Sequence, residues 1–574
     1  MAAAAPAPRP STMAAPWLVG GAPPQRGRRV VAEVPRLHGR APAALPAPPV
    51  RAGGSSSIRA VLAASGAAGL LPALRRQRRS HRCRAAATAA TPAEDSAPGS
   101  ATVVGAGPAG LAAALMLAGR GWEVTVIERS QDPAGFDPGR GFMYLIDGRG
   151  QGCLKALGHG LLEELQQSSV AMAETRIGAL TPAGLKTRVN PMKDATRNSY
   201  WLPRHVFVRL LLSAAEREPR IRLVAGASLE ALRREPSGLF SAHGASGDSS
   251  FEVHGKLLVG ADGIRSAVRA QLEEWDGGRG SFVPREFDSP AAGLRYKVLT
   301  LPSDFSVDVP NGTEELKSEV MYSVRGAAAK GPKLRMGMIP VRSIFGSRTA
   351  NVITKPDDAF WDVEDVDGLL AYAARQWPHF PIESFVPREE LERFAADRGG
   401  RFPKPQHSPS AAWAAASAEG QAEEAGAVIL GDALHAFPPD IGQGVNSALE
   451  DVMVLAHSLD TQGDGRPAAA VKSFEEARMP DAEALVQMVR VSAPFQYSQD
   501  PFRAKLWSLS FLGRLLLNKA MPSIFDLPSF MLVQRAELSY SEVWSRGRRG
   551  ARRAGLLLGS AALAGAGLLV RLVA

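Results

Sequence analysis

The first clear signal in the hydrophobic pattern is a strand, turn, helix and strand at residues 101–130. Thr102 to Val104 is a short apolar and β-branched run, as expected of a buried parallel strand. Small and apolar residues at 111–117 predict a helix, and residues 124–127 form a second apolar run of strand length. This order predicts the opening unit of a parallel α/β sheet.

The pattern changes further along the chain. Strand candidates fill residues 292–354 in short runs, which is typical of a separate antiparallel sheet, and residues 360–400 return to helical character. Another buried strand is predicted at 427–430, and most of the chain from 445 to about 553 is predicted to be helical. The chain therefore combines an α/β unit with a second sheet and a helical C-terminal region.

The formal net charge of +10 is concentrated at the two ends of the chain. Residues 1–90 contain 14 arginines, no lysine and one acid, and residues 546–574 contain six arginines and no acid. The body between these ends is mildly acidic, which argues against nucleic-acid binding.

Residues 1–90 are rich in alanine, proline, arginine and serine, and they show no sustained periodicity. This composition predicts an organelle transit peptide, disordered and followed by a flexible linker at 91–100. The length and the proline and serine content favour a chloroplast over a mitochondrion. An unprocessed disordered tail is the alternative.

The C-terminal tail predicts a membrane anchor. Residues 554–570 carry no charged side chain and are bracketed by arginines. This is the low end of the length that spans a bilayer, but the preceding basic cluster suits an anionic membrane surface. We therefore expect a transmembrane anchor at 554–574, with a soluble core helix as the alternative.

The two cysteines, Cys83 and Cys153, predict no metal site. Cys83 lies in the predicted transit peptide, and a single remaining cysteine can form neither an internal disulfide nor a thiolate metal site.

Three glycines occupy the turn of the opening unit. Gly105, Gly107 and Gly110 stand in G-x-G-x-x-G order, which allows a tight turn, close approach of the backbone to a pyrophosphate, and close packing of helix and strand. Glu128 lies at the end of the second strand, 18 residues beyond Gly110, where a carboxylate can accept ribose hydroxyls. The unit predicts dinucleotide binding and leaves NAD and FAD open.

Two later stretches place a carboxylate at the end of a predicted strand. Asp262 follows one apolar run, and Asp432 follows another. After Asp432, a loop rich in proline and glycine leads to a helix whose start carries Gly442, Gly444 and Asn446. Open N–H groups at such a helix start suit a pyrophosphate or the electronegative edge of a flavin.

These motifs together resemble a known family. The segments GAGPAG, GADGIRSAVR and GDALHAFPPDIGQGVNSALED, in this order within residues 100–460, resemble the flavoprotein aromatic hydroxylases of the 4-hydroxybenzoate hydroxylase type. Within that family, GRGFMYLIDGRG at 139–150, RMPD at 478–481 and MPS at 521–523 are most similar to the kynurenine 3-monooxygenase-like proteins.

The resemblance implies an α/β fold with an FAD-binding Rossmann-type domain, an antiparallel substrate sheet and a helical C-terminal region. On this basis the discontinuous FAD-binding domain comprises 101–175, 200–280 and 425–475. The substrate-binding sheet domain comprises 176–199 and 281–424, and the C-terminal helices comprise 476–553.

The motifs and the resemblance predict a set of FAD-binding residues. These are Gly105, Gly107, Pro108, Ala109, Gly110, Glu128, Arg129, Arg140, Arg204, Leu229, Asp262, Gly263, Asp432, Pro439, Gly442, Gly444, Val445 and Asn446. Arg176 is a candidate for binding the substrate and is equally open to being a solvated strand residue. No catalytic side chain is predicted, because the flavin carries the chemistry, and His435 is interpreted as structural.

The resemblance implies an FAD-dependent monooxygenase that uses NADPH or NADH together with O2. Oxygen would add at flavin C4a, and the hydroperoxide would hydroxylate an aromatic or other electron-rich small molecule. One alternative is a plastid flavin-dependent prenyl reductase similar to the geranylgeranyl reductases. The other is a non-catalytic prenyl-binding carrier.

Overall fold

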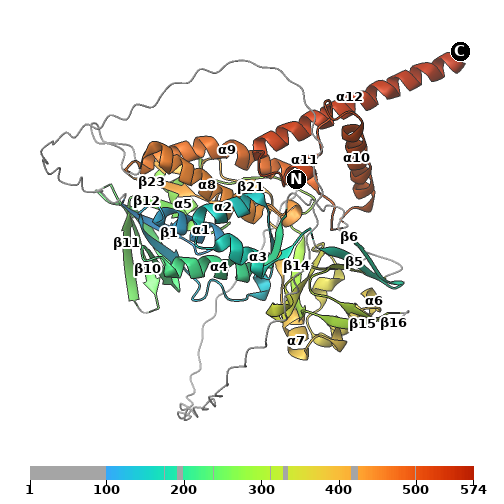
Figure 1. The fold of residues 1–574 in the computed structure, drawn as a ribbon, viewed down its shortest axis with the longest axis horizontal. Coiled ribbons are helices and arrows are strands. Elements are labelled where there is room, and N and C mark those ends of the chain that lie inside the picture. Colours follow the sequence, from blue (N-terminus) through green and yellow to red (C-terminus); the bar gives the residue numbers. More distant parts are fainter. Residues whose placement is uncertain are drawn as a thin grey trace, which may run out of the picture. The chain divides into compact units, whose positions relative to one another are not determined.

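The computed structural model describes residues 99–573 except for 174, 190–197, 237, 248, 310–311, 328–333, 415–424, 464 and 498 (Figure 1). The predicted transit peptide at 1–90 lies outside the described residues. Nothing in the described structure or in the similar proteins indicates a transit peptide or a chloroplast, so these two predictions are not upheld.

A six-stranded sheet in the order β22-β23-β12-β1-β2-β8 organises the first part of the described chain. All neighbouring strands are parallel except β22, which pairs antiparallel with β23. Val103, Leu258 and Val428 are fully buried in three adjacent strands, as expected of a parallel sheet covered on both faces. The strands are β1 Ser100–Val104, β2 Glu123–Glu128, β8 Ile221–Ala225, β12 Leu257–Gly260, β22 Ala412–Ala414 and β23 Gly426–Ile429.

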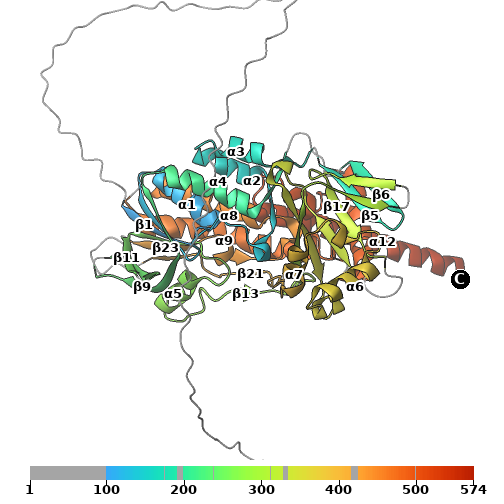
Figure 2. The same cartoon turned by 90° about the horizontal axis from the view of Figure 1, so that it is seen from below.

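Helix α1, Pro108–Ala118, follows β1 and packs against β1 and β2. It begins at a proline, which fits the first turn of a helix, and Ala109 to Ala118 are all buried, so the helix is apolar on every side. It lies side by side with α4 and α8 (Figure 2). The helices around this sheet are α2 Gly148–Leu157, α3 Leu161–Ser168, α4 Arg204–Arg217, α5 Ala267–Trp275, α8 Gly444–Gln462 and α9 Pro467–Ser492.

A seven-stranded sheet in the order β20-β14-β19-β18-β17-β5-β6 forms a second structural layer. The β17 and β5 strands are parallel and every other pair is antiparallel. Phe360, Trp377 and Phe394 are almost fully buried in its core together with residues of α6 and α7. The elements are β5 Arg176–Thr181, β6 Gly184–Val189, β14 Arg295–Pro302, β17 Met321–Arg325, β18 Arg335–Met338, β19 Ser347–Thr354, β20 Gly400–Arg401, α6 Val366–Gln376 and α7 Arg388–Ala396.

Four smaller sheets connect these layers. Their strands are β3 Met143–Ile146, β4 Val170–Ala171 and β7 Tyr200–Pro203; β9 Ala227–Arg234, β10 Phe240–Ser246 and β11 Ser249–Gly255; β13 Arg285–Glu286, β21 Gln406–His407 and β24 His435–Ala436; and β15 Phe305–Val309 with β16 Gly312–Leu316. The 3-10 helices are η1 Pro138–Arg140, η2 Ser343–Phe345, η3 Ala359–Asp362, η4 Ile382–Ser384, η5 Gly431–Ala433 and η6 Pro439–Ile441. The predicted α/β fold class is confirmed, and the predicted domain boundaries stay predictions.

The C-terminal region is helical, as predicted. After α9 follow α10 Pro501–Ala520, α11 Ser529–Leu532 and α12 Tyr540–Val573. Within the described residues, no helix combines the length and the apolar character needed to cross a membrane. The prediction of a transmembrane anchor at 554–574 is therefore wrong. Its uncharged stretch is rich in alanine and glycine, which are only weakly hydrophobic.

Candidate cofactor and substrate site

The glycine turn after β1 has no room for a side chain at two of its three glycines. Gly105 has a φ of 103°, and a Cβ added there would lie 2.4 Å from the carbonyl oxygen of Ala261. A Cβ at Gly110 would lie 1.9 Å from the carbonyl oxygen of Gly105, whereas one at Gly107 would meet no atom within 4 Å. The first and third glycines let the turn close, and Gly107 faces open space where a pyrophosphate fits.

Glu128 ends β2, and its carboxylate is tied to the same turn. Oε2 accepts a hydrogen bond from the Ala106 N–H at 2.7 Å, and Oε1 accepts one from the Ser130 N–H at 2.7 Å. A carboxylate oxygen has two lone pairs, so each can accept one further hydrogen bond from a ribose hydroxyl. Arg129, the next residue, is exposed.

Asp262 follows β12 and caps helix α5. Its Oδ2 accepts hydrogen bonds from the N–H groups of Ala267 at 2.6 Å and Val268 at 3.2 Å. Its Oδ1 is buried without a hydrogen-bond partner in the described structure, and burial raises the pKa of this carboxyl. Gly263 follows with a φ of 84°. One oxygen of Asp262 thus serves the fold, and the other is free to accept from a cofactor.

Asp432 lies in η5, directly after β23. Solvent reaches its side chain, yet the surrounding protein raises the pKa of the carboxyl by burial, while His435 acts in the opposite direction. This combination is expected of a group that lines a cleft. The strands β23, β12 and β1 are neighbours in one parallel sheet. The residues that follow them therefore lie together at the carboxyl end of the sheet, where α/β proteins bind ligands. These residues are Asp432, Asp262 and the glycine turn.

The backbone at the start of α8 is unobstructed and lies toward the same end of the sheet. Gly442 has a φ of 63°, and a Cβ at Gly442 or Gly444 would meet no atom within 4 Å. Val445, the second residue of α8, is buried. The first N–H groups of a helix have no partner within it, so this helix start can donate to an electronegative cofactor edge.

Asn446 lies in the first turn of α8, where its predicted role depends on the backbone, and its side chain has a separate role within the protein. It is fully buried. Its side chain accepts a hydrogen bond from the Asp147 N–H at 3.0 Å and donates to the carbonyl oxygen of Leu145 at 2.8 Å. The amide therefore joins α8 to β3 and α2, and its side-chain groups are used within the protein.

Of the remaining predicted residues, Arg204 has the clearest relation to the site. It begins α4, its backbone N–H donates to the carbonyl oxygen of Phe142 at 2.9 Å, and its charge opposes, to a small extent, the rise in the pKa of Asp432 that burial causes. The others are Pro108 and Ala109 in the first turn of α1, Pro439 in η6, Leu229 in β9 and Arg140 in η1, where only the backbone of Arg140 is described.

A buried group of charges supports η5 and α8. Arg478 of α9 is fully buried, and its guanidinium bonds Asp451 at 2.6 Å and Glu450 at 2.8 Å. Asp451 also accepts a hydrogen bond from the Gly431 N–H at 2.7 Å and lies 3.1 Å from His435 Nε2. His435 is therefore engaged in a structural hydrogen bond with Asp451 next to the site. Adjacency of Glu450 and Asp451 in the sequence gave no sign that they share this arginine.

A second network, which the sequence did not reveal, ties the C-terminal region to the start of α8. Gln443 donates to Asp147 Oδ2 at 3.0 Å, and its Oε1 accepts a hydrogen bond from the Tyr540 hydroxyl at 2.7 Å. Arg149 donates to the carbonyl oxygens of Val533 at 2.6 Å and Leu538 at 2.7 Å. The contacts of Arg149 join residues almost 400 positions apart and those of Gln443 join residues 296 and 97 positions apart, so no local motif could predict them.

Asp440 lies in η6, within the segment predicted to be a loop rich in proline and glycine, and the sequence did not predict the environment of its side chain. It is 5% exposed, and Gln496 Nε2 donates to its Oδ1 at 3.2 Å and to its backbone oxygen at 3.0 Å. Its Oδ2 has no hydrogen-bond partner in the described structure. Burial raises the pKa of Asp440 to about 7, although Gln496 and Tyr497 favour the charged form.

A row of aromatic rings extends from Tyr497, beside Asp440, to the seven-stranded sheet. Tyr497 contacts Phe402 with 5.6 Å between ring centroids, Phe402 stacks on Tyr296 of β14 at 5.4 Å, and Tyr296 contacts Phe142 at 4.8 Å. We call Phe142, Tyr296, Phe402 and Tyr497 the aromatic row. Phe402 is buried and the other three rings are partly buried, so the row is a packed hydrophobic cluster with partly exposed rings at its two ends.

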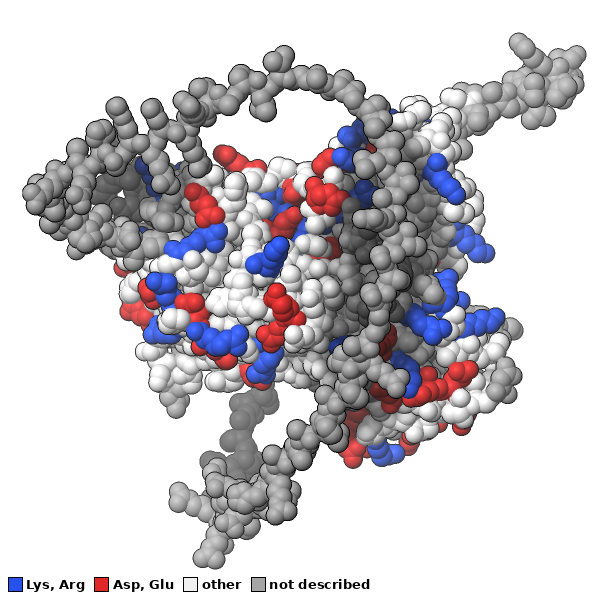
Figure 3. Space-filling view, viewed as in Figure 1, with Lys and Arg blue, Asp and Glu red and all other residues white. Residues whose placement is uncertain are grey.

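Arg176, the predicted substrate residue, gains no support from its position. It is exposed on β5, and its guanidinium donates to the Thr187 hydroxyl across the β5–β6 pair at 3.4 Å. On the face shown in Figure 3, basic and acidic side chains are intermixed, and no field of a single sign marks a binding surface there.

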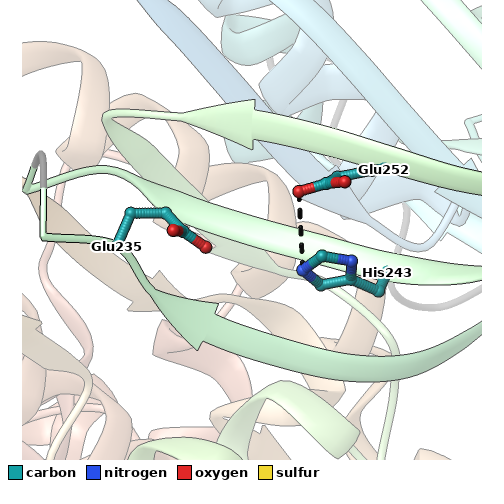
Figure 4. Close-up of side chains that lie close together, drawn as sticks. All are labelled: Glu235, His243 and Glu252. Atoms are coloured by element: carbon teal, nitrogen blue, oxygen red, sulfur yellow. Dashed lines mark ion pairs between the residues drawn. The ribbon is translucent and has the colours of Figure 1, made fainter.

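One group of potential metal ligands was not anticipated. Glu235, His243 and Glu252 bring one ligand atom each to within 4.8 Å of one another on the β9–β11 sheet (Figure 4). His243 is already bonded to Ser241 at 2.9 Å, and Glu252 lies 3.3 Å from His254. These contacts describe a cross-strand polar network at the surface, which needs no ion to account for it.

The residues at the carboxyl end of the six-stranded sheet form a site that fits FAD. They provide space at Gly107, hydrogen-bond acceptors at the unpaired Oδ1 of Asp262 and the exposed side chain of Asp432, and backbone donors at the start of α8. An elongated dinucleotide with a pyrophosphate, a ribose and a flavin edge matches each of them.

Comparison with known proteins agrees with this geometry. Residues 100–288 and 386–489 match the family described as FAD binding domain. Similar curated proteins include the kynurenine 3-monooxygenases of Salinispora tropica, 28% identical over 78% of this chain and 90% of that protein, and of Salinispora arenicola, 29% identical over 81% and 95%. A mutant of 2-methyl-3-hydroxypyridine-5-carboxylic acid oxygenase has a similar fold, with a TM-score of 0.50 and 17% identity over 71% of this chain and 98% of that one.

Proposed function

The chain belongs to the FAD binding domain family, and we propose that, as an FAD-dependent monooxygenase, it hydroxylates an aromatic small molecule with electrons from NADPH or NADH. This proposal rests on one observation: the glycine turn, Asp262 and Asp432 lie together at the carboxyl end of the parallel sheet. When bound, FAD supplies the activation of O2, so that one oxygen atom enters the substrate and the other leaves as water.

The protein's own groups bind and orient. The open backbone at Gly107 and the first N–H groups of α1 face a pyrophosphate, and Glu128 accepts from a ribose hydroxyl. The bare start of α8 directs backbone dipoles toward the flavin edge that gains negative charge on reduction. None of these roles requires a protein nucleophile, in line with the absence of a predicted catalytic side chain.

The prenyl reductase and the prenyl-binding carrier are not favoured. The similar curated proteins described above are monooxygenases by name. The carboxylates of Glu128, Asp262 and Asp432 are all present in positions suited to a dinucleotide, which a carrier without redox chemistry would not require.

Replacing Asp432 with alanine is expected to remove FAD while leaving the chain folded. The side chain is exposed, and no hydrogen bond between it and another residue is found in the described structure. We expect FAD occupancy, measured as the ratio of flavin to protein absorbance, to fall at least about tenfold, as for the loss of one charged hydrogen bond. The melting temperature of the FAD-free protein should stay near that of FAD-free wild type.

The matched control is Asp460→Ala, which breaks the exposed ion pair with Arg120. It should keep both FAD and activity. Full FAD occupancy in Asp432→Ala would contradict the assignment of the site. Wild-type protein that consumes NADPH without forming any hydroxylated product from aromatic probes would contradict the proposed reaction.

A further inference from the structure

We propose that Asp440 determines substrate specificity by accepting, through Oδ2, a hydrogen bond from a hydroxyl or amino group on the substrate ring. This inference rests on the proposed function, because it places the substrate between the flavin-binding loop and the aromatic row. It assigns to this chain a recognition residue in the loop between Pro438 and Gly442, where a carboxylate favours a donor and disfavours an acidic group.

The position of Asp440 in the chain brings it to the reacting end of the site. Asp440 is the middle residue of η6, and Gly442 and the first residue of α8, Gly444, follow it at once. The same short segment therefore presents open backbone to the cofactor and a carboxyl group to its neighbourhood.

The free oxygen of Asp440 requires an explanation. The residue is 5% exposed, and Oδ2 has no partner in the described structure, whereas Oδ1 accepts from Gln496. Buried carboxylate oxygens are normally hydrogen-bonded, and a missing partner costs free energy. The nearby Tyr497 hydroxyl interacts with the Asp440 carboxyl and favours its charged form, but no hydrogen bond to Oδ2 is found in the described structure. A ligand donor supplies the missing partner.

The surroundings of Asp440 select for a ring. Tyr497 lies at one end of the aromatic row, and the row continues through Phe402 and Tyr296. An aromatic substrate that lies along these rings can place a substituent next to Asp440. At a pH above the Asp440 pKa of about 7, a carboxylate substituent would be repelled there, and a hydroxyl or amino group would be held.

A purely structural role for Asp440 predicts something different. In that case its purpose would be the bonds from Gln496, which hold the chain at Gln496 against η6. The variant D440N keeps an acceptor oxygen for Gln496 but replaces the free oxygen by an NH2 donor. The variant Q496M removes the bonds from Gln496 and keeps the free carboxylate oxygen. The two variants therefore separate recognition from structural support.

The test measures ligand binding to the full-length, FAD-loaded protein through the change in flavin absorbance. The probes are three matched sets: phenol, aniline and anisole; 3-hydroxy-, 3-amino- and 3-methoxybenzoate; and 4-hydroxy-, 4-amino- and 4-methoxyquinoline. In wild type, the hydroxy or amino member of at least one set should bind about tenfold or more tightly than its methyl ether, as for one hydrogen bond to a charged group.

We expect D440N to lose this preference while retaining FAD, and Q496M to keep the preference. The proposal is overturned if wild type shows no preference in any set, or if D440N keeps it, or if Q496M loses it as fully as D440N. Product analysis separates this from the proposed function. FAD-loaded protein that hydroxylates a probe without donor preference overturns the role of Asp440 alone, and protein that binds no FAD overturns both.

Discussion

Replacing Arg478 with methionine is expected to lower the free energy of unfolding by about 3–5 kcal/mol, as for breaking a buried ion pair by removal of one partner. Arg478 and Asp451 are both fully buried, with 2.6 Å between Nε and Oδ1. Methionine fills much of the same volume but leaves the Asp451 carboxylate without its nearest cation. Urea unfolding followed by circular dichroism measures the loss.

Arg120→Met is the matched control. Arg120 bonds Asp460 at 2.7 Å, but both side chains are partly exposed, and such pairs contribute about 0–1 kcal/mol. If Arg478→Met destabilises the protein no more than Arg120→Met does, the buried charge group does not stabilise the site as described.

The same pair sets an expected dependence of stability on pH. Burial alone would raise the pKa of Asp451, but His435 and Arg478 together lower it below its ordinary value. A carboxyl with a lowered folded-state pKa stabilises the fold above its unfolded pKa of about 4, and this contribution disappears as the pH falls through the folded value. Wild type should therefore lose stability below about pH 4, and Arg478→Met should show a weaker loss.

The second large effect concerns Gly110. Gly110→Ala is expected to abolish FAD binding and to destabilise the protein by about 1–3 kcal/mol or more, as for overpacking. The added Cβ would lie 1.9 Å from the carbonyl oxygen of Gly105, a backbone atom that can move only if the turn opens. FAD occupancy after purification and the melting temperature of the FAD-free protein report the two effects.

Gly107→Ala separates packing from ligand binding. Its Cβ would meet no protein atom within 4 Å, so the FAD-free protein should keep its stability to within about 1 kcal/mol, an ordinary effect at an open position. FAD affinity should still fall by about tenfold or more, because the methyl group occupies the space that the pyrophosphate requires. Equal stability losses in the two variants would contradict this division of roles.

The sequence predicted those parts of the site that depend on local order. The turn at Gly105, Gly107 and Gly110 follows directly from residue spacing, because a strand, a tight turn and a helix leave few alternatives. Asp262 and Asp432 were predicted for the same reason, since each follows an apolar run of strand length. Only the tertiary structure shows that one carboxylate oxygen of Asp262 accepts hydrogen bonds from the start of α5.

The parts that sequence reasoning missed depend on contacts between distant segments. The cofactor role predicted for Asn446 rests on its backbone and stays a prediction, whereas the contacts of its side chain with β3 and α2 were not predicted. The unpaired oxygen of Asp440 arises because the segment around Gln496 folds over η6, and no periodicity reveals such a contact. The membrane anchor was a wrong prediction because the uncharged length and the preceding arginines outweighed the weak hydrophobicity of alanine and glycine in the interpretation.

The bonds from Tyr540 to Gln443 and from Leu538 to Arg149 bear on how the protein is made. The start of α8, which we propose faces the flavin, is braced by Tyr540, 97 positions further along the chain. During synthesis, all the proposed nucleotide-binding motifs are made before residues 533–540, so a growing chain lacks this brace until those residues are added. A chain cut short before Val533 would therefore contain every proposed motif but not the contacts that hold the start of α8 in place.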